Sequence, residues 1–120
     1  MRIWMRLEII TMGLLTLSLA PFFAATAAAQ DPKLVEQGAK LFVDQKCSLC
    51  HSVAGKGNQK GPMEEHLAKV SAADIREWIV NAKEMTAKTK SERKPEMKAY
   101  TLEKGDVDAL VAYLMSVKKK

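Results

Sequence analysis

The sequence is poor in aromatic residues and lacks any pattern typical of a β-strand. Of its 120 residues, 3 are Phe, 2 Trp and 2 Tyr, and no segment alternates apolar with polar residues as a half-buried strand would. Basic and aromatic residues are not interleaved as on a surface that binds single-stranded nucleic acid. The length predicts one domain. Because a chain this small buries a modest core, a bulky apolar cofactor would add to its stability.

The first 29 residues have the pattern of an export signal. Arg2 and Arg6 precede an apolar run over residues 9–25, and the alanines at 27–29 are the small residues that a signal peptidase needs. We expect cleavage after Ala29, which leaves residues 30–120 as a periplasmic domain without a membrane span. An uncleaved anchor is the alternative, because residues 9–29 approach the roughly 20 apolar residues of a spanning helix.

The expected mature chain is mildly basic. Loss of Arg2, Arg6 and Glu8 leaves 17 basic and 13 acidic side chains, so the net charge falls from +5 to +4. Such an excess suits an acidic protein partner attracted by long-range steering. We expect a monomer with a basic rim in the second half of the chain, formed by Lys83, Lys88, Lys90, Arg93, Lys94 and Lys98.

Three segments have helical periodicity, which predicts an all-α domain. The first helix starts at Asp31 as N-cap with Pro32 in its first turn. In this helix Gly38 allows another helix to approach closely. The second starts at Ser71, and Asp74 completes a capping box. The apolar residues that should face the core are Leu34, Leu41 and Phe42 in the first helix and Ile75, Trp78, Ile79 and Ala82 in the second.

The third helix is expected from about Thr101 to Val117. Val107, Leu110, Val111 and Leu114 follow the i, i+3, i+4, i+7 spacing of one helix face. Residues 52–62 are rich in Gly, Lys and Asn and are predicted to form a loop. Residues 83–98 are highly charged and contain a proline, so they are predicted to be irregular as well.

The most specific motif is Cys47-Ser48-Leu49-Cys50-His51, which has the spacing of a c-type haem attachment site. If the segment is helical, residues three apart lie on one face, and both thiols can add to the vinyl groups at one porphyrin edge. His51 can then place its imidazole under the iron as the proximal ligand.

Three other kinds of site share part of this motif. A thioredoxin-like redox pair also uses C-x-x-C, but it is expected beside a strand in a βαβ unit. Zinc needs four well-spread donors, and no further cysteine exists. A structural disulfide between Cys47 and Cys50 would leave His51 without a role.

Beyond this motif, the chain resembles the class I cytochromes c over nearly all of residues 31–120. Gly38, Phe42, Leu110 and Tyr113 match the family's crossing of the N- and C-terminal helices. The resemblance implies a small cytochrome c fold, in which these helices cross around one covalently bound haem c. It also implies an electron carrier rather than an enzyme.

The resemblance extends to residues around the haem. Gly61-Pro62 matches the Gly-Pro that follows the haem histidine, which implies that the Pro62 carbonyl accepts a hydrogen bond from His51 Nδ1–H. Trp78 lies where the family often carries an aromatic residue, and its indole N–H could bind a haem propionate. An ordinary core tryptophan is the alternative for Trp78.

The resemblance implies Met97 as the sixth ligand of the iron, because it stands just before the last helix. A Met opposite a His raises the potential of a cytochrome. The family often has Met-Pro here, whereas Pro95 precedes Met97 by two residues and Lys98 follows it. Met85 could compete. His66 is expected to be a solvated surface residue and would otherwise give a bis-His site.

The predicted function is therefore single-electron transfer through an exposed haem edge, with both axial positions filled by His51 and Met97. Met63 and Met115 are expected to be core residues. One alternative is a haem enzyme or gas sensor with an open sixth position. The other is a thiol–disulfide oxidoreductase that uses Cys47 and Cys50.

Overall fold

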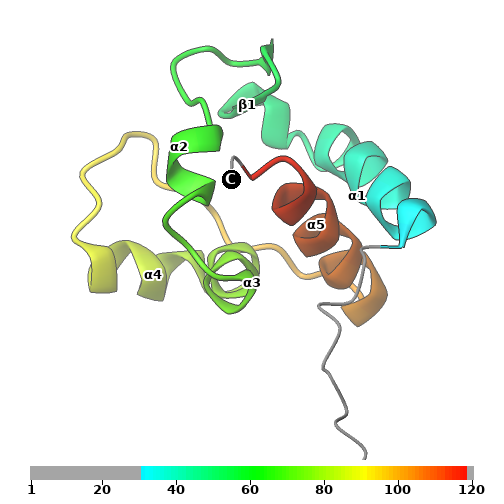
Figure 1. Cartoon of the computed structure of the whole chain (residues 1–120). Helices are drawn as coiled ribbons and strands as arrows, with labels where there is room; N and C mark the ends of the chain where they lie inside the picture. The colour runs from blue at the N-terminus through cyan, green and yellow to red at the C-terminus, as the bar shows by residue number, and fades with distance from the viewer. Residues whose placement is uncertain (1–30, 119–120) are drawn as a thin grey trace, which may run out of the picture.

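The computed structural model describes residues 31–118, so the predicted export signal lies outside the described residues. The helices α1, α3 and α5 form the main body (Figure 1), and the described part of the chain is predominantly helical, as predicted. Within residues 31–118 no helix is long and apolar enough to cross a bilayer. The elements are α1 (Pro32–Asp44), the 3₁₀ turn η1 (Cys47–Leu49), β1 (Ser52–Val53), β2 (Lys56–Gly57), α2 (Glu64–Leu67), α3 (Ala72–Val80), α4 (Ala82–Thr89) and α5 (Lys104–Ser116).

Helix α1 begins as its sequence predicts and packs across α5 (Figure 1). The Asp31 carboxylate accepts a hydrogen bond of 2.9 Å from the Lys33 N–H, which caps the helix. At Gly38 the two backbones nearly touch: a Cβ here would overlap the carbonyl oxygen of Ala109 and lie 2.7 Å from Tyr113 Cβ. The rings of Phe42 and Tyr113 meet edge to face, 5.7 Å between centroids. The predicted crossing of the two terminal helices is confirmed.

Helix α5 supplies much of the core. The predicted apolar face is buried, with Val107, Leu110, Val111 and Leu114 each at most 8% exposed. The helix begins at Lys104, three residues later than predicted. Glu103 is its N-cap and has an extended backbone, so residues 101–103 lead into the helix rather than forming its first turn.

Helix α3 has the predicted capping box. Ser71 Oγ accepts a hydrogen bond of 3.1 Å from the Asp74 N–H, and the Asp74 carboxylate accepts one of 3.0 Å from the Ser71 N–H. Ile75 and Ile79 are buried against α5. The helix ends at Val80, because Asn81 leaves the helical region (φ −128°, ψ 40°). Ala82 is fully buried as predicted, but it belongs to α4.

The prediction that residues 83–98 are irregular was wrong for their first half. Helix α4 covers Ala82–Thr89, and it buries Met85 against the rest of the molecule. Ala, Lys, Glu and Met are strong helix formers, and the charged side chains of this segment point to solvent. The helix ends at Lys90, which has a left-handed backbone conformation. From Lys90 the chain follows an irregular path to α5; we call residues 90–103 the Met97 segment.

The loop predicted over residues 52–62 contains a short β-hairpin, a detail that the sequence did not indicate. Strands β1 and β2 form an antiparallel pair in the register Ser52↔Gly57 and Val53↔Lys56. Ala54 and Gly55, both with positive φ, make the turn between them. Strands of two residues are too short to show any alternation, so the periodicity of the sequence could not reveal them.

Candidate functional site

The motif Cys47–His51 forms a tight helical turn, which we call the attachment turn. The Cys50 and His51 N–H groups both donate to the Cys47 carbonyl, at 3.1 and 2.9 Å. Residues i and i+3 of a 3₁₀ turn eclipse one another, so Cys47 and Cys50 share one face. Both are free thiols; Cys47 is partly buried and Cys50 is exposed. This is the arrangement expected of two thiols that bind one edge of a porphyrin.

The loop after His51 is hydrogen-bonded to the attachment turn. The Asn58 N–H donates to the carbonyls of Ser48 and His51, at 3.0 and 3.1 Å, and its side-chain amide donates to the Leu49 carbonyl at 2.9 Å. Gly57 makes this approach possible: its φ is +106°, and a Cβ there would overlap the His51 carbonyl oxygen. Asn58 and Gly57, two of the residues that predicted a loop, therefore also help to fix the position of His51.

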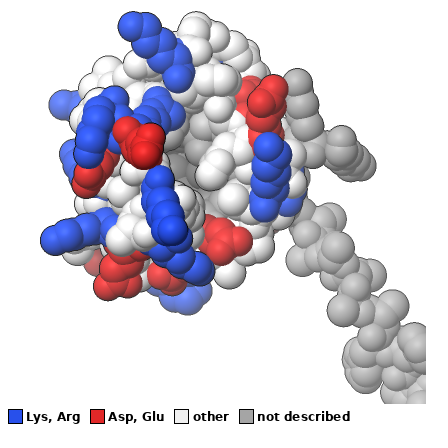
Figure 2. All heavy atoms as spheres, turned by 90° about the vertical axis from the view of Figure 1, so that its left-hand side faces the viewer, with Lys and Arg blue, Asp and Glu red and all other residues white. Residues whose placement is uncertain are grey.

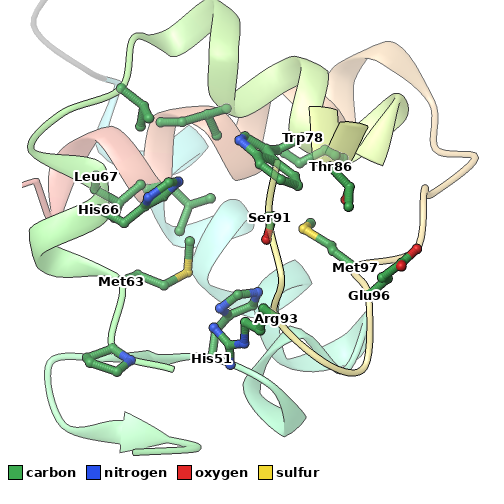
Figure 3. Close-up of a pocket in the computed structure, with 15 residues that line it drawn as sticks. His51, Met63, His66, Leu67, Trp78, Thr86, Ser91, Arg93, Glu96 and Met97 are labelled. Carbon is green, nitrogen blue, oxygen red and sulfur yellow. The ribbon is translucent and has the colours of Figure 1, made fainter. Parts of the chain in front are cut away.

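A cavity of about 260 Å³ opens beside His51; we call it the main cavity. Its wall includes Met97 from the Met97 segment and Met63 from the start of α2, and Figure 3 shows these side chains projecting into one space with His51. A smaller side cavity of about 30 Å³ is lined by Cys47 and shares His51 and Met97 with the main one. The apolar wall of the main cavity consists mainly of Leu67, Val70, Ile75, Ile79 and Leu114.

The residues present suit a haem. A porphyrin requires an apolar slot with a donor atom on each face and, for covalent attachment, thiols at one edge. His51 and Met97 supply an imidazole and a thioether to the same cavity, and Cys47 lies on the adjoining wall. Among residues 31–118 no three His, Cys, Asp or Glu side chains gather as a metal site, so the zinc interpretation finds no ligand set.

The methionines differ in where the structure places them. Met97 lines both cavities, whereas Met85 is 6% exposed in α4 and is not part of either wall. Met63 was expected to be a core residue, but it too lines both cavities. The sequence could have indicated this position of Met63, because it directly follows Gly61-Pro62, the dipeptide expected to lie against His51.

The pKa of His51 is lowered, mainly because the imidazole is partly buried and also because the Arg93 guanidinium lies nearby. A lowered pKa keeps the ring neutral at pH 7, which is the form that binds a metal. The hydrogen bond that opposes this shift is donated by the His51 imidazole to the backbone carbonyl of Gly61. The predicted acceptor was the carbonyl of Pro62, which lines the main cavity, so in this structure the contact falls one residue earlier than predicted.

Cys47 lacks the lowered pKa that a reactive thiol of a redox pair would have. Burial is the main cause that raises the pKa of Cys47, and it outweighs a hydrogen bond with Tyr100 that lowers it. Catalytic thiols have lowered pKa values. The pair also follows helix α1 and not a strand of a βαβ unit. Both observations disfavour the thiol–disulfide oxidoreductase.

Trp78 lies on the wall of the main cavity, next to the second histidine of the described chain. Its ring meets that of His66 edge to face, with 6.4 Å between centroids. The indole N–H makes no hydrogen bond to the residues that the structure describes. His66 is exposed, as predicted, although it also lines the main cavity. Trp78 therefore combines a half-buried ring with a donor that remains available to a ligand.

Three polar residues on the cavity wall were not predicted as part of the site: Thr86, Ser91 and Glu96. Arg93, which was expected only in a basic rim, lines the cavity as well. All four belong to α4 or the Met97 segment, whose path sequence reasoning left open.

Comparison with known proteins gives one match. A family model described as Cytochrome c matches residues 35–118, which include the attachment turn, the cavity walls and Met97. No curated protein matches the chain, and no solved structure matches it.

Proposed function

The chain belongs to the cytochrome c family, whose members bind haem c covalently and transfer electrons, and we propose that it is a periplasmic carrier of single electrons. When bound, the haem supplies the Fe(II)/Fe(III) couple. Cys47 and Cys50 would hold one haem through thioethers, with His51 as the proximal ligand. The observation that carries the proposal is that His51 and Met97 line the same cavity beside Cys47.

Met97 is proposed as the sixth ligand. Because it lines both cavities with His51, its thioether already lies beside the space proposed for the haem. Met85 would have to leave its buried position in α4. With both axial positions taken by the protein, substrate has no site on the iron, which favours a carrier over a haem enzyme or gas sensor.

Other residues around the main cavity are proposed to support the haem. The apolar wall excludes water from the porphyrin faces, and a dry environment is one of the factors that set a potential. The backbone of Gly61 orients the His51 imidazole. The free indole N–H of Trp78 is proposed to donate to a haem propionate.

The experiment uses full-length protein expressed with periplasmic haem maturation. Intact mass should show one haem on the chain cleaved after Ala29, and the oxidised protein should show the sulfur-to-iron charge-transfer band. Met97→Ala should abolish this band, whereas the control Met85→Ala should keep it. Bare polypeptide would refute the carrier, and a band that survives Met97→Ala would assign the sixth ligand to another residue.

We also propose that the carrier docks on an acidic redox partner as a monomer. Residues 83–98 contain six basic and three acidic side chains, and all six basic ones are exposed. Figure 2 shows Lys and Arg side chains around a hollow on the face formed by α4 and the Met97 segment, with acidic groups between them. Such redox complexes are small, below about 1,200 Å². Association rates should fall as ionic strength rises; rates independent of salt would exclude this docking mode.

A further inference from the structure

Arg93 connects two parts of the chain that are far apart in sequence. It lies in the Met97 segment, four residues before Met97, and its guanidinium donates to the carbonyl of Cys50 in the attachment turn. Although much of its side chain is exposed, Arg93 also lines the main cavity, and Figure 3 shows it beside His51. One side chain thus joins the segment that carries Met97 to the segment that carries His51.

The surroundings are shaped to receive this guanidinium. A Cβ at Gly61 would overlap the Cys50 carbonyl oxygen and one guanidinium nitrogen of Arg93, and it would lie 2.8 Å from the other. Gly61 therefore leaves open the space in which Arg93 meets Cys50. At this point the guanidinium makes a charged hydrogen bond in a space that only glycine at position 61 leaves free.

Few other contacts hold the first part of the Met97 segment. The Ser91 N–H donates to the Thr86 carbonyl at 3.1 Å, which ties the segment only to the helix it has just left. Lys94 binds Glu96 at 2.6 Å, within the segment itself. The next bond to the body of the molecule is made by the Tyr100 N–H, which donates to the Ile79 carbonyl at 2.8 Å. Between Ser91 and Tyr100, Arg93 makes the only hydrogen bond among the described residues that reaches another element.

We propose that Arg93 is a positioning residue that fastens the Met97 segment to the attachment turn, keeps Met97 opposite His51 and raises the haem potential. This inference rests on the proposed function. The hydrogen bond would limit how far the Met97 segment can move away from the attachment turn, and with a haem bound the fixed positive charge beside His51 would favour the reduced over the oxidised iron.

The test compares Arg93→Gln with Lys94→Gln in matured full-length protein. Lys94 is the adjacent residue, is exposed, and makes no contact with the attachment turn. Its substitution by Gln therefore removes the same charge and leaves the turn untouched. Two properties are measured: the rate at which excess imidazole replaces Met97 on the iron, and the midpoint potential. Arg93→Gln should speed replacement about tenfold, which corresponds to the loss of one charged hydrogen bond, and should lower the potential. Lys94→Gln should change the rate less than about twofold.

Arg93→Lys separates the two effects. It keeps the charge but loses the planar fork of donors, so replacement by imidazole should still be faster while the potential stays near that of the wild type. If Arg93→Gln matches Lys94→Gln in both properties, the inference is wrong. If wild-type protein carries haem but lacks the sulfur-to-iron band, Met97 is not the ligand, and the proposed function fails together with this inference.

Discussion

Helices α1 and α5 and the Met97 segment show two different ways of holding the site together. Where the helices cross, backbones are in contact: Gly38 lies against the Ala109 carbonyl, and buried apolar side chains surround that point. The Met97 segment has no regular structure: its first part is tied to the body by the hydrogen bond from Arg93 to Cys50, and its last part by the bond from Tyr100 to Ile79 and by the packing of Tyr100 and Leu102 on the core. The crossing should therefore determine whether the domain folds, and the Met97 segment should determine the properties of the iron.

This division follows from the kind of contact each region makes. Apolar burial and backbone approach involve many atoms at once, so one change in the crossing disturbs all of them. A segment held by separate hydrogen bonds loses only one when one residue is changed. Variants in the crossing should alter the free energy of unfolding and leave the ligation unchanged, whereas variants in the Met97 segment should do the reverse.

The largest effect on stability is expected for Gly38→Ala. The added methyl overlaps the Ala109 carbonyl, so the helices must separate, at a cost of about 3 kcal/mol. Chemical denaturation of the matured protein measures the loss. The sulfur-to-iron band of the folded protein should persist, because Met97 lies outside the crossing.

The matched control is Gly105→Ala in the first turn of α5. A Cβ at Gly105 meets nothing within 4 Å, and alanine favours a helix over glycine by up to about 1 kcal/mol. This variant should be as stable as the wild type or slightly more stable. If both substitutions had the same effect, close approach at Gly38 would not explain the stability of the crossing.

A smaller effect is expected at the start of α3. This helix and the crossing helices α1 and α5 together form what we call the framework, but the start of α3 lies away from the crossing. Ser71→Ala removes the acceptor of the Asp74 N–H and should cost about 1 kcal/mol. Denaturation midpoints measure this loss. If the folded variant keeps the sulfur-to-iron band, the helices affect stability without affecting the iron, as expected. Loss of the band would contradict this separation of roles.

The same capping box predicts a pH dependence. Hydrogen bonds from Ser71 lower the pKa of Asp74, so its carboxylate contributes stability above the pKa of the unfolded chain and loses it as the pH falls through the folded value. Asp74→Asn should therefore be less stable than the wild type at pH 7, and the difference should shrink below about pH 4. A difference independent of pH would assign the effect to the side-chain amide instead.

The sequence allowed the framework to be predicted because its signals are local. The caps at Asp31 and Ser71 and the buried face of α5 each depend on residues within two turns of one another, and all were confirmed. Helix α4 was not predicted, because a high density of charge is also typical of a loop, although its residues favour a helix. Composition alone could not decide between an exposed helix and an exposed loop.

The cavity walls could be predicted only in part. The spacing of Cys47, Cys50 and His51 is a local signal, and the structure forms them into one turn. Met63 and Arg93 reach the cavity through the path of irregular segments, which depends on distant contacts that no periodicity records. Met97 was assigned from family resemblance, and its role as a ligand stays a prediction.

The smallest effect is expected at Lys98, whose ammonium lies 5.2 Å from the centre of the Tyr100 ring. Lys98→Gln removes this cation–π contact, and because the Lys98 ammonium belongs to an exposed side chain the change should cost only about 0.5 kcal/mol. The measurement is the shift of the urea midpoint relative to the control Lys94→Gln, which breaks an exposed ion pair of the same segment. A loss as large as that of Gly38→Ala would contradict the division, because it would mean that the Met97 segment supports the fold as strongly as the helix crossing does.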